Sequence, residues 1–114
     1  MLFRFLMVFC WFVAAFATVA EADIVLTNST TNYTQDFDTL ASTGATGTVV
    51  PFGWYFNETG TGANTSYGVG TGSSNAGNTY SFGATGSTDR AFGGLLSNAV
   101  VPTIGARFIN QGTT

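Results

Sequence analysis

The sequence contains no histidine and no lysine, it has a single cysteine, and only 8% of its 114 residues are charged. Without lysine, the glycine-rich stretch at 68–72 has no basic residue to meet a phosphate, which argues against a phosphate-binding loop. The cysteine, Cys10, lies inside an apolar run near the start of the chain. Residues 23–114 therefore hold no disulfide, and no constellation of catalytic residues is visible in them.

Positive charge is also scarce. The whole chain has three arginines against six acidic residues, and beyond residue 22 only Arg90 and Arg107 remain. Proteins that bind nucleic acid need a basic patch to neutralise the phosphate backbone. We therefore expect no nucleic acid to bind this chain, whose polar surface is supplied by Thr, Ser, Asn and Gly.

The one long apolar run is N-terminal. Arg4 precedes an unbroken apolar stretch at 5–17, and Ala20-Glu21-Ala22 places small residues at the two positions that a signal peptidase reads. The uncharged stretch ends at Glu21, too early for a membrane-spanning helix of about 20 residues. We predict that residues 1–22 are a signal peptide, that the chain is secreted or reaches the cell surface, and that no membrane segment remains after cleavage. An exported chain without disulfides is typical of bacterial envelope and extracellular proteins.

Residues 23–114 are expected to form one all-β domain. Eleven aromatic residues lie in this part, which is more buryable surface than disordered chains have. Apolar residues never recur at helical spacing over two turns, and glycines interrupt every candidate helix. Runs with strand-like composition instead predict strands at 24–26, 33–38, 54–57, 67–69 and 104–109, and on both sides of a loop at 83–89.

Six or seven short strands separated by turn residues favour a β-sandwich of the jelly-roll kind. Residues 51–53 are expected to form a turn, 40–49 a loop, and Pro102 a bend before the last strand. Such sandwiches commonly contain more strands, and residues 110–114 look like the start of another turn. We therefore expect an incomplete jelly roll, truncated at its C-terminal end, that is marginally stable or prone to aggregate by itself.

Five short motifs cover turns and aromatic residues of the predicted strands: Gln-Asp-Phe-Asp-Thr-Leu at 35–40, Pro-Phe-Gly-Trp at 51–54, Tyr-Ser-Phe-Gly at 80–83, Asp-Arg-Ala-Phe-Gly-Gly-Leu at 89–95 and Pro-Thr-Ile-Gly-Ala at 102–106. Together they resemble the N-terminal β-sandwich region of modular secreted bacterial proteins. Those proteins often end in a sorting signal of the PEP or type IX kind, and some carry a lamin-tail-like or extracellular endonuclease module downstream. The resemblance covers residues 33–111 and implies an extracellular β-sandwich, with no catalytic residue to carry over.

Asp36 and Asp38 form the first candidate site. Their spacing of two places both carboxylates on the same side of the predicted strand, where a hard cation such as calcium would find oxygen ligands. Calcium needs six to eight converging oxygens, so a solvated strand edge is the commoner outcome for such a pair. Arg90 follows Asp89 at the entrance to a strand and is expected to cap the surface, the alternative being that it pairs with a carboxylate across the sheet.

Tyr55 is the second candidate. Neighbouring strand residues point to opposite faces, so one of Trp54 and Tyr55 belongs to the core while the other is free to form an aromatic platform for a sugar ring. The simpler alternative is that both rings are packed. If a ligand binds, we expect a polysaccharide that meets Tyr55 and neighbouring Asn and Thr groups.

Two functions remain open from the sequence. The first is a non-catalytic extracellular module for attachment or recognition, with polysaccharide or cell-surface components as partners. The alternative is an N-terminal accessory domain of a larger secreted enzyme, such as an endonuclease or another hydrolase, whose catalytic part is encoded beyond Thr114. The genomic sequence past Thr114 would discriminate between them, because it would contain either an enzyme domain or further β modules with a sorting signal.

Overall fold

The computed structural model describes residues 22–28 and 32–112, and this part of the chain is all-β and sandwich-like, as the sequence predicts. It contains no helix, and therefore none that would be long and apolar enough to cross a membrane. Residues 1–21, which make up nearly all of the predicted signal peptide, lie outside the described part. The strands are β1 (Ile24–Leu26), β2 (Thr46–Gly47), β3 (Trp54–Thr59), β4 (Tyr67–Gly70), β5 (Asn78–Phe82), β6 (Ala91–Leu95), β7 (Val101–Ala106) and β8 (Phe108–Asn110).

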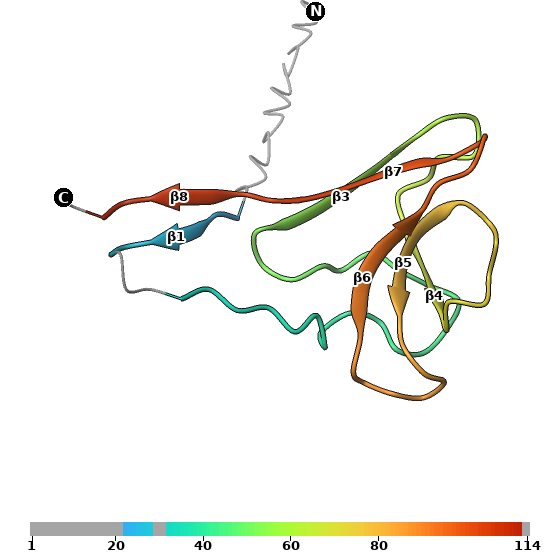
Figure 1. Ribbon diagram of the computed structural model, residues 1–114, viewed down its shortest axis with the longest axis horizontal. Coiled ribbons are helices and arrows are strands. Elements are labelled where there is room, and N and C mark those ends of the chain that lie inside the picture. The colour runs from blue at the N-terminus through green and yellow to red at the C-terminus, as the bar shows by residue number, and fades with distance from the viewer. Residues whose placement is uncertain (1–21, 29–31, 113–114) are drawn as a thin grey trace, which may run out of the picture.

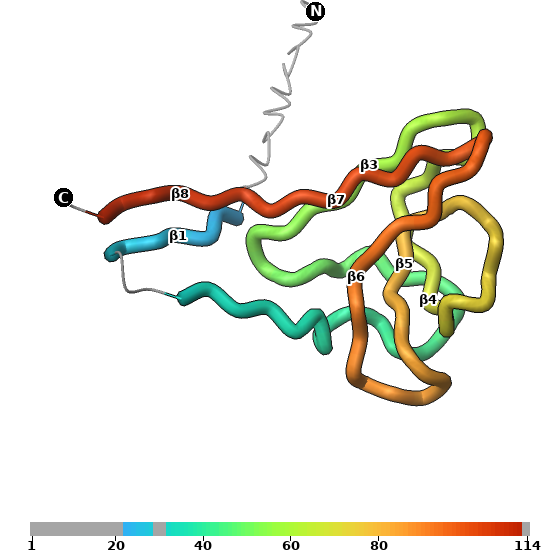
Figure 2. Tube along the Cα trace, in the orientation of Figure 1, coloured from blue at the N-terminus to red at the C-terminus, as the bar shows by residue number. Residues whose placement is uncertain are grey.

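The strands form three sheets (Figure 1). One has four strands in the order β2-β4-β5-β6, and the other two are the pairs β3–β7 and β1–β8. Strands β5 and β6 contact β7, which places the four-stranded sheet against the β3–β7 pair. Strand β7 runs on into β8, so the β1–β8 pair lies at the end of the molecule away from β4 and β5 (Figures 1 and 2).

The hairpin predicted around the loop at 83–89 is confirmed. Strands β5 and β6 pair antiparallel with Tyr80 opposite Gly93. Between them the Ser87 amide donates to the Ala84 carbonyl at 3.0 Å, and Gly86 has a φ of +74°. A turn with positive φ at its third residue favours glycine there, so the local sequence determines where the hairpin reverses.

Five aromatic rings cluster between the sheets, where Tyr67 is buried and the other four are half-buried. The buried apolar side chains of the described residues are Ile24, Leu40, Tyr67, Tyr80 and Val100. Phe92 of β6 lies at the centre, with its ring centroid 5.9 Å from Phe37, 6.0 Å from Phe56 and 5.8 Å from Tyr67. Trp54 joins the cluster through an edge-on contact with Phe37 at 4.7 Å. Edge-to-face pairs of this kind add stabilisation beyond the area that they bury.

The predicted strand at 33–38 is wrong, because this segment pairs with no strand. Its side chains bond the local backbone instead: Gln35 Oε1 accepts from the Phe37 amide and Asp36 Oδ1 from the Asp38 amide. Such bonds compete with strand pairing. Phe37 takes a left-handed φ of +64°, which directs the chain into a turn closed by the Leu40 amide and the Phe37 carbonyl.

The 40–49 loop predicted after this segment is present, but it includes the two-residue strand β2. The described strands number eight rather than six or seven.

The end of the chain also differs from expectation. Pro102 lies inside β7, opposite Glu58, and bends nothing. Among the described strands β7 pairs only with β3, and an edge strand tolerates a proline because no partner needs its missing amide. The predicted strand at 104–109 is split at Arg107, whose amide donates to the Gly53 carbonyl and whose carbonyl accepts from the Ile24 amide. The chain thereby changes partner from β3 to β1.

Candidate functional site

The structure places Asp36 and Asp38 together, but each carboxylate already bonds the backbone. Asp36 Oδ1 accepts from the Asp38 amide at 3.1 Å, and Asp38 Oδ1 accepts from the Arg90 amide at 3.0 Å. Within the described residues no third Asp, Glu, His or Cys joins them to form a group that could hold a metal ion. Calcium binding at this pair therefore stays a prediction. The two carboxylates would supply only part of the six to eight oxygen ligands that calcium takes.

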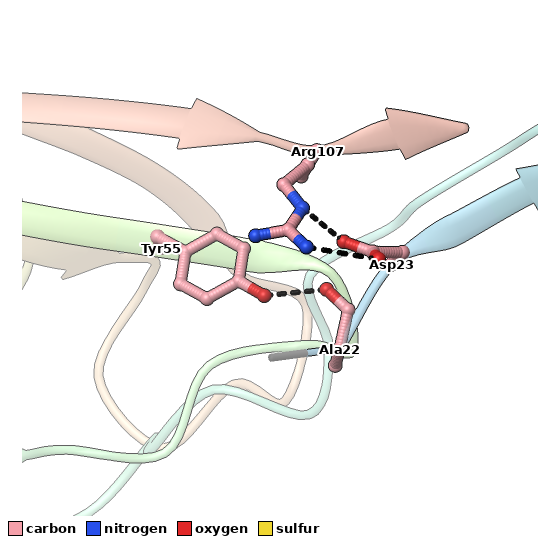
Figure 3. Close-up of polar contacts among 4 residues, drawn as sticks. All are labelled: Ala22, Asp23, Tyr55 and Arg107. Carbon is pink, nitrogen blue, oxygen red and sulfur yellow. Dashed lines mark hydrogen bonds and ion pairs between the residues drawn. The ribbon is translucent and has the colours of Figure 1, made fainter. Parts of the chain in front are cut away.

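Tyr55 lies on the outer face of the β3–β7 pair and is 38% exposed, whereas its neighbour Trp54 contacts the core. The two rings therefore lie on opposite faces, as expected from the sequence. The Tyr55 hydroxyl donates to the carbonyl of Ala22, next to an ion pair between Asp23 and Arg107 (Figure 3). On this outer face Tyr55 lies opposite Gly105, and Asn57 lies opposite Thr103. Tyr55, Asn57 and Thr103 thus lie on the same outer face, with Tyr55 and Asn57 exposed.

A concave site is found instead beside the four-stranded sheet. We call it the Arg90 pocket: a cavity of about 380 Å³ lined by residues 42–44, by residues 69–71 at the end of β4, by residues 83–86 of the β5–β6 loop, and by Arg90. Its lining contains Ser and Thr residues, glycines, the apolar side chains of Val69 and Ala84 and one cation, and no carboxylate. Drug-sized and sugar-sized ligands commonly occupy cavities of about 300–1,000 Å³.

Arg90 is buried, at 4% exposure, so the surface cap expected from the sequence is wrong. Its Nε donates to Ser81 Oγ at 2.8 Å and its Nη2 to the Ser81 carbonyl at 2.5 Å. Longer bonds run from Nη2 to the Gly70 carbonyl at 3.3 Å and from Nη1 to the Ala84 carbonyl at 3.5 Å. The guanidinium thus ties β4, β5 and the β5–β6 loop together at the base of the pocket.

The other wall of the pocket is fixed by hydroxyl groups. The buried Ser81 hydroxyl donates to the Ala41 carbonyl at 2.8 Å, immediately before the 42–44 segment. The Tyr67 hydroxyl accepts from the Ala41 amide at 3.0 Å and donates to the Val49 carbonyl at 2.8 Å. Because both ends of this loop are held to buried side chains, the pocket is preformed rather than assembled by a ligand.

Sequence reasoning did not find this site. The residues that build it are separated by up to about fifty positions, and the glycines, serines and threonines among them are common throughout the chain. The one available signal was Arg90 itself, a charged residue directly after a glycine-containing turn in a chain with few charges.

A second cavity, of about 430 Å³, shares Arg90, Thr71 and residues 83–84 with the Arg90 pocket but is also lined by Asp89.

No protein-family model, curated protein or solved structure matches the chain.

Proposed function

We propose that this chain is a non-catalytic recognition module, which attaches a secreted protein to carbohydrate at the cell exterior. The observation that carries the proposal is the Arg90 pocket. It is preformed, large enough for a sugar ring, and lined by hydroxyl and backbone groups that can exchange hydrogen bonds with sugar hydroxyls.

The composition of the pocket supports recognition over hydrolysis. Glycoside hydrolysis generally requires two carboxyl groups on opposite sides of the scissile bond, one as acid and one as base or nucleophile. The lining of the Arg90 pocket has none. Glu58, a buried carboxylate of the described residues, is engaged by the Thr79 amide and by Asn64, away from this lining.

The proposal places the module outside the cell because residues 1–22 have the three regions of a signal peptide in order. N-terminal sequencing of the secreted product is expected to start between residues 21 and 23. Mature protein that retains Met1 would contradict export.

Binding is tested by applying the labelled full chain to a panel of polysaccharides, with and without a calcium chelator. We expect one class of glycan to be retained without being cleaved. Thr43→Trp should abolish retention, because Thr43 lines the Arg90 pocket and an indole would fill it. Thr61→Trp, in an exposed loop outside that lining, is the matched control and should bind normally.

The Tyr55 platform predicts a different pattern. If Tyr55→Ala abolishes retention and Thr43→Trp does not, the sugar lies on the outer face of β3–β7 and the pocket is not the site. Cleavage of any glycan by the chain, or retention of none, would refute the proposed function.

A further inference from the structure

The Arg90 guanidinium is a buried cation that makes no ion pair with a carboxylate of the described residues. All the acceptors of its bonds are neutral: one hydroxyl and three backbone carbonyls. The ion pair recorded between side chains of the described residues is that of Arg107 with Asp23, in another region. Burying a charge with no opposite charge is costly, and a bound anion would offset that cost.

One end of the guanidinium makes fewer hydrogen bonds than the other. Nε and Nη2 make the short bonds, whereas Nη1 has a single contact, at 3.5 Å, for its two hydrogens. Nη1 lies against residues that line the pocket, because a Cβ built on Gly83 would be only 2.4 Å from it. Gly83 and Ala84 line both the Arg90 pocket and the second cavity, so the donor capacity that remains to Arg90 is next to residues that the two cavities share.

The remaining donor capacity of Arg90 Nη1 suits an anion with a single negative charge. The lining of the Arg90 pocket itself contains no carboxylate; Asp89 lines the adjoining cavity, which shares Thr71, residues 83–84 and Arg90 with the pocket, and Asp38 accepts from the backbone amide of Arg90. Phosphate and sulfate groups are commonly held by several cations or by a helix N-terminus. Here one guanidinium stands among neutral hydroxyls, in a chain of net charge −3. This chemistry suits a singly charged carboxylate attached to a hydroxylated ring.

We propose that the Arg90 pocket selects an acidic polysaccharide, with the carboxylate of a uronic acid residue at Arg90 Nη1 and the ring hydroxyls at the serine and threonine groups around it. This inference rests on the proposed carbohydrate recognition and adds the class of sugar. Charge-assisted hydrogen bonds are about twice as strong as neutral ones, so the acidic sugar gains most from this contact.

The test compares oligogalacturonate with a neutral galactan of the same length, by titration calorimetry on the full chain. We expect oligogalacturonate to bind at least tenfold more tightly at low salt, and the ratio to shrink as salt is added. Equal affinity for the two would refute the selectivity while leaving carbohydrate recognition intact. Binding of neither would refute both, and equally tight binding of dextran sulfate would refute the choice of carboxylate.

A charge placed in the pocket locates the site. Thr85 lines the cavity and is exposed, so the carboxylate of Thr85→Glu is expected to occupy the anion position and to weaken oligogalacturonate binding at least tenfold. Thr61→Glu carries the same charge on a loop outside the lining and should retain wild-type affinity. Thr43→Glu repeats the test from the opposite wall if Thr85→Glu fails to fold. Unchanged affinity in a folded pocket variant would show that the anion binds elsewhere.

Discussion

The two ends of this molecule are ordered by different interactions. In and beside the four-stranded sheet several buried side chains are polar: Ser81 is fully buried and Arg90 is 4% exposed, and both are hydrogen-bonded, while the buried Tyr67 uses its hydroxyl for two backbone bonds. At the β1–β8 end a single apolar side chain, Ile24, is buried, while Val25 and Phe108 on the same two strands are exposed. The comparison shows a chain with few charges using hydrogen bonds at one end and apolar contact at the other.

The difference has a functional consequence. Hydrogen bonds are directional, so the polar end holds its loops in one geometry and can present a preformed pocket. Apolar contact at the β1–β8 end is less directional and supports only two short parallel strands. The predictions below test whether the two ends respond to substitution in these different ways.

The largest effect is expected from Arg90→Leu. Leucine is apolar and suits burial, yet it removes the donors to Ser81 and Gly70. Each charge-assisted bond contributes roughly 1.5–3 kcal/mol, so the free energy of unfolding should fall by at least about 3 kcal/mol. Urea denaturation measures it. The matched change Arg107→Leu removes a guanidinium that is 49% exposed and should cost less than about 1 kcal/mol. Equal losses of stability in the two variants would show that the two ends of the molecule do not differ in their dependence on a buried arginine.

The next largest effect is expected at the apolar end. Ile24 is 5% exposed and its side chain packs so closely on Gly53 that a Cβ there would lie 2.4 Å from Ile24 Cγ1. Ile24→Ala should therefore cost about 2–4 kcal/mol, the usual range for truncating a buried isoleucine. The neighbouring Val25, at 41% exposure, is the control, and Val25→Ala is expected to change the thermal midpoint little. Similar shifts for both would mean that β1 is not held by Ile24.

A smaller loss of stability is expected from Glu58→Gln. Glu58 lies on β3, and its carboxylate joins this strand to the four-stranded sheet. Glu58 is buried and accepts from the Thr79 amide at 2.6 Å and from Asn64 at 3.1 and 3.2 Å. An amide nitrogen cannot accept, so one donor is left unpaired at a cost of about 1–3 kcal/mol. Asp89→Asn makes the same change of charge at an exposed position and should be neutral in the same denaturation experiment. A neutral Glu58→Gln would show that the buried carboxylate is not needed there.

The local features of this fold could be predicted from the sequence. The turn at 51–53 and the β5–β6 hairpin are predicted from local turn composition, and in the structure a glycine with positive φ marks the reversal in each, at Gly53 and at Gly86. The strand at 67–69 was predicted from alternation alone. In each case the information lies within a few residues, where composition and backbone preference agree.

The rest depends on contacts between distant residues. Nothing local indicates that β1 pairs with β8 in parallel, or that the Phe37 ring enters the core through a left-handed backbone turn rather than from a strand. Arg90 is the clearest case, because one of its acceptors is the carbonyl of Gly70 on β4, which the fold alone brings to it. A single sequence therefore predicts the strands and turns of the pocket but not the pocket.

The smallest effect concerns the ion pair that joins the start of β1 to the junction of β7 and β8. Asp23 and Arg107 are paired, with Arg107 Nη2 3.1 Å from Asp23 Oδ2 (Figure 3). The arginine side chain is 49% exposed and that of Asp23 is 17% exposed, so solvent reaches the pair from the arginine side. Water and salt screen such a pair, so Asp23→Asn should cost less than about 1 kcal/mol at low salt and nothing measurable at 1 M salt. The backbone bond from the Ile24 amide to the Arg107 carbonyl is unaffected by this change and keeps β1 in register. Denaturation of Asp23→Asn and wild type at the two salt concentrations measures the difference. A loss above 2 kcal/mol, or one that persists at 1 M salt, would mean that this end too depends on a polar contact, and the contrast between the two ends would no longer hold.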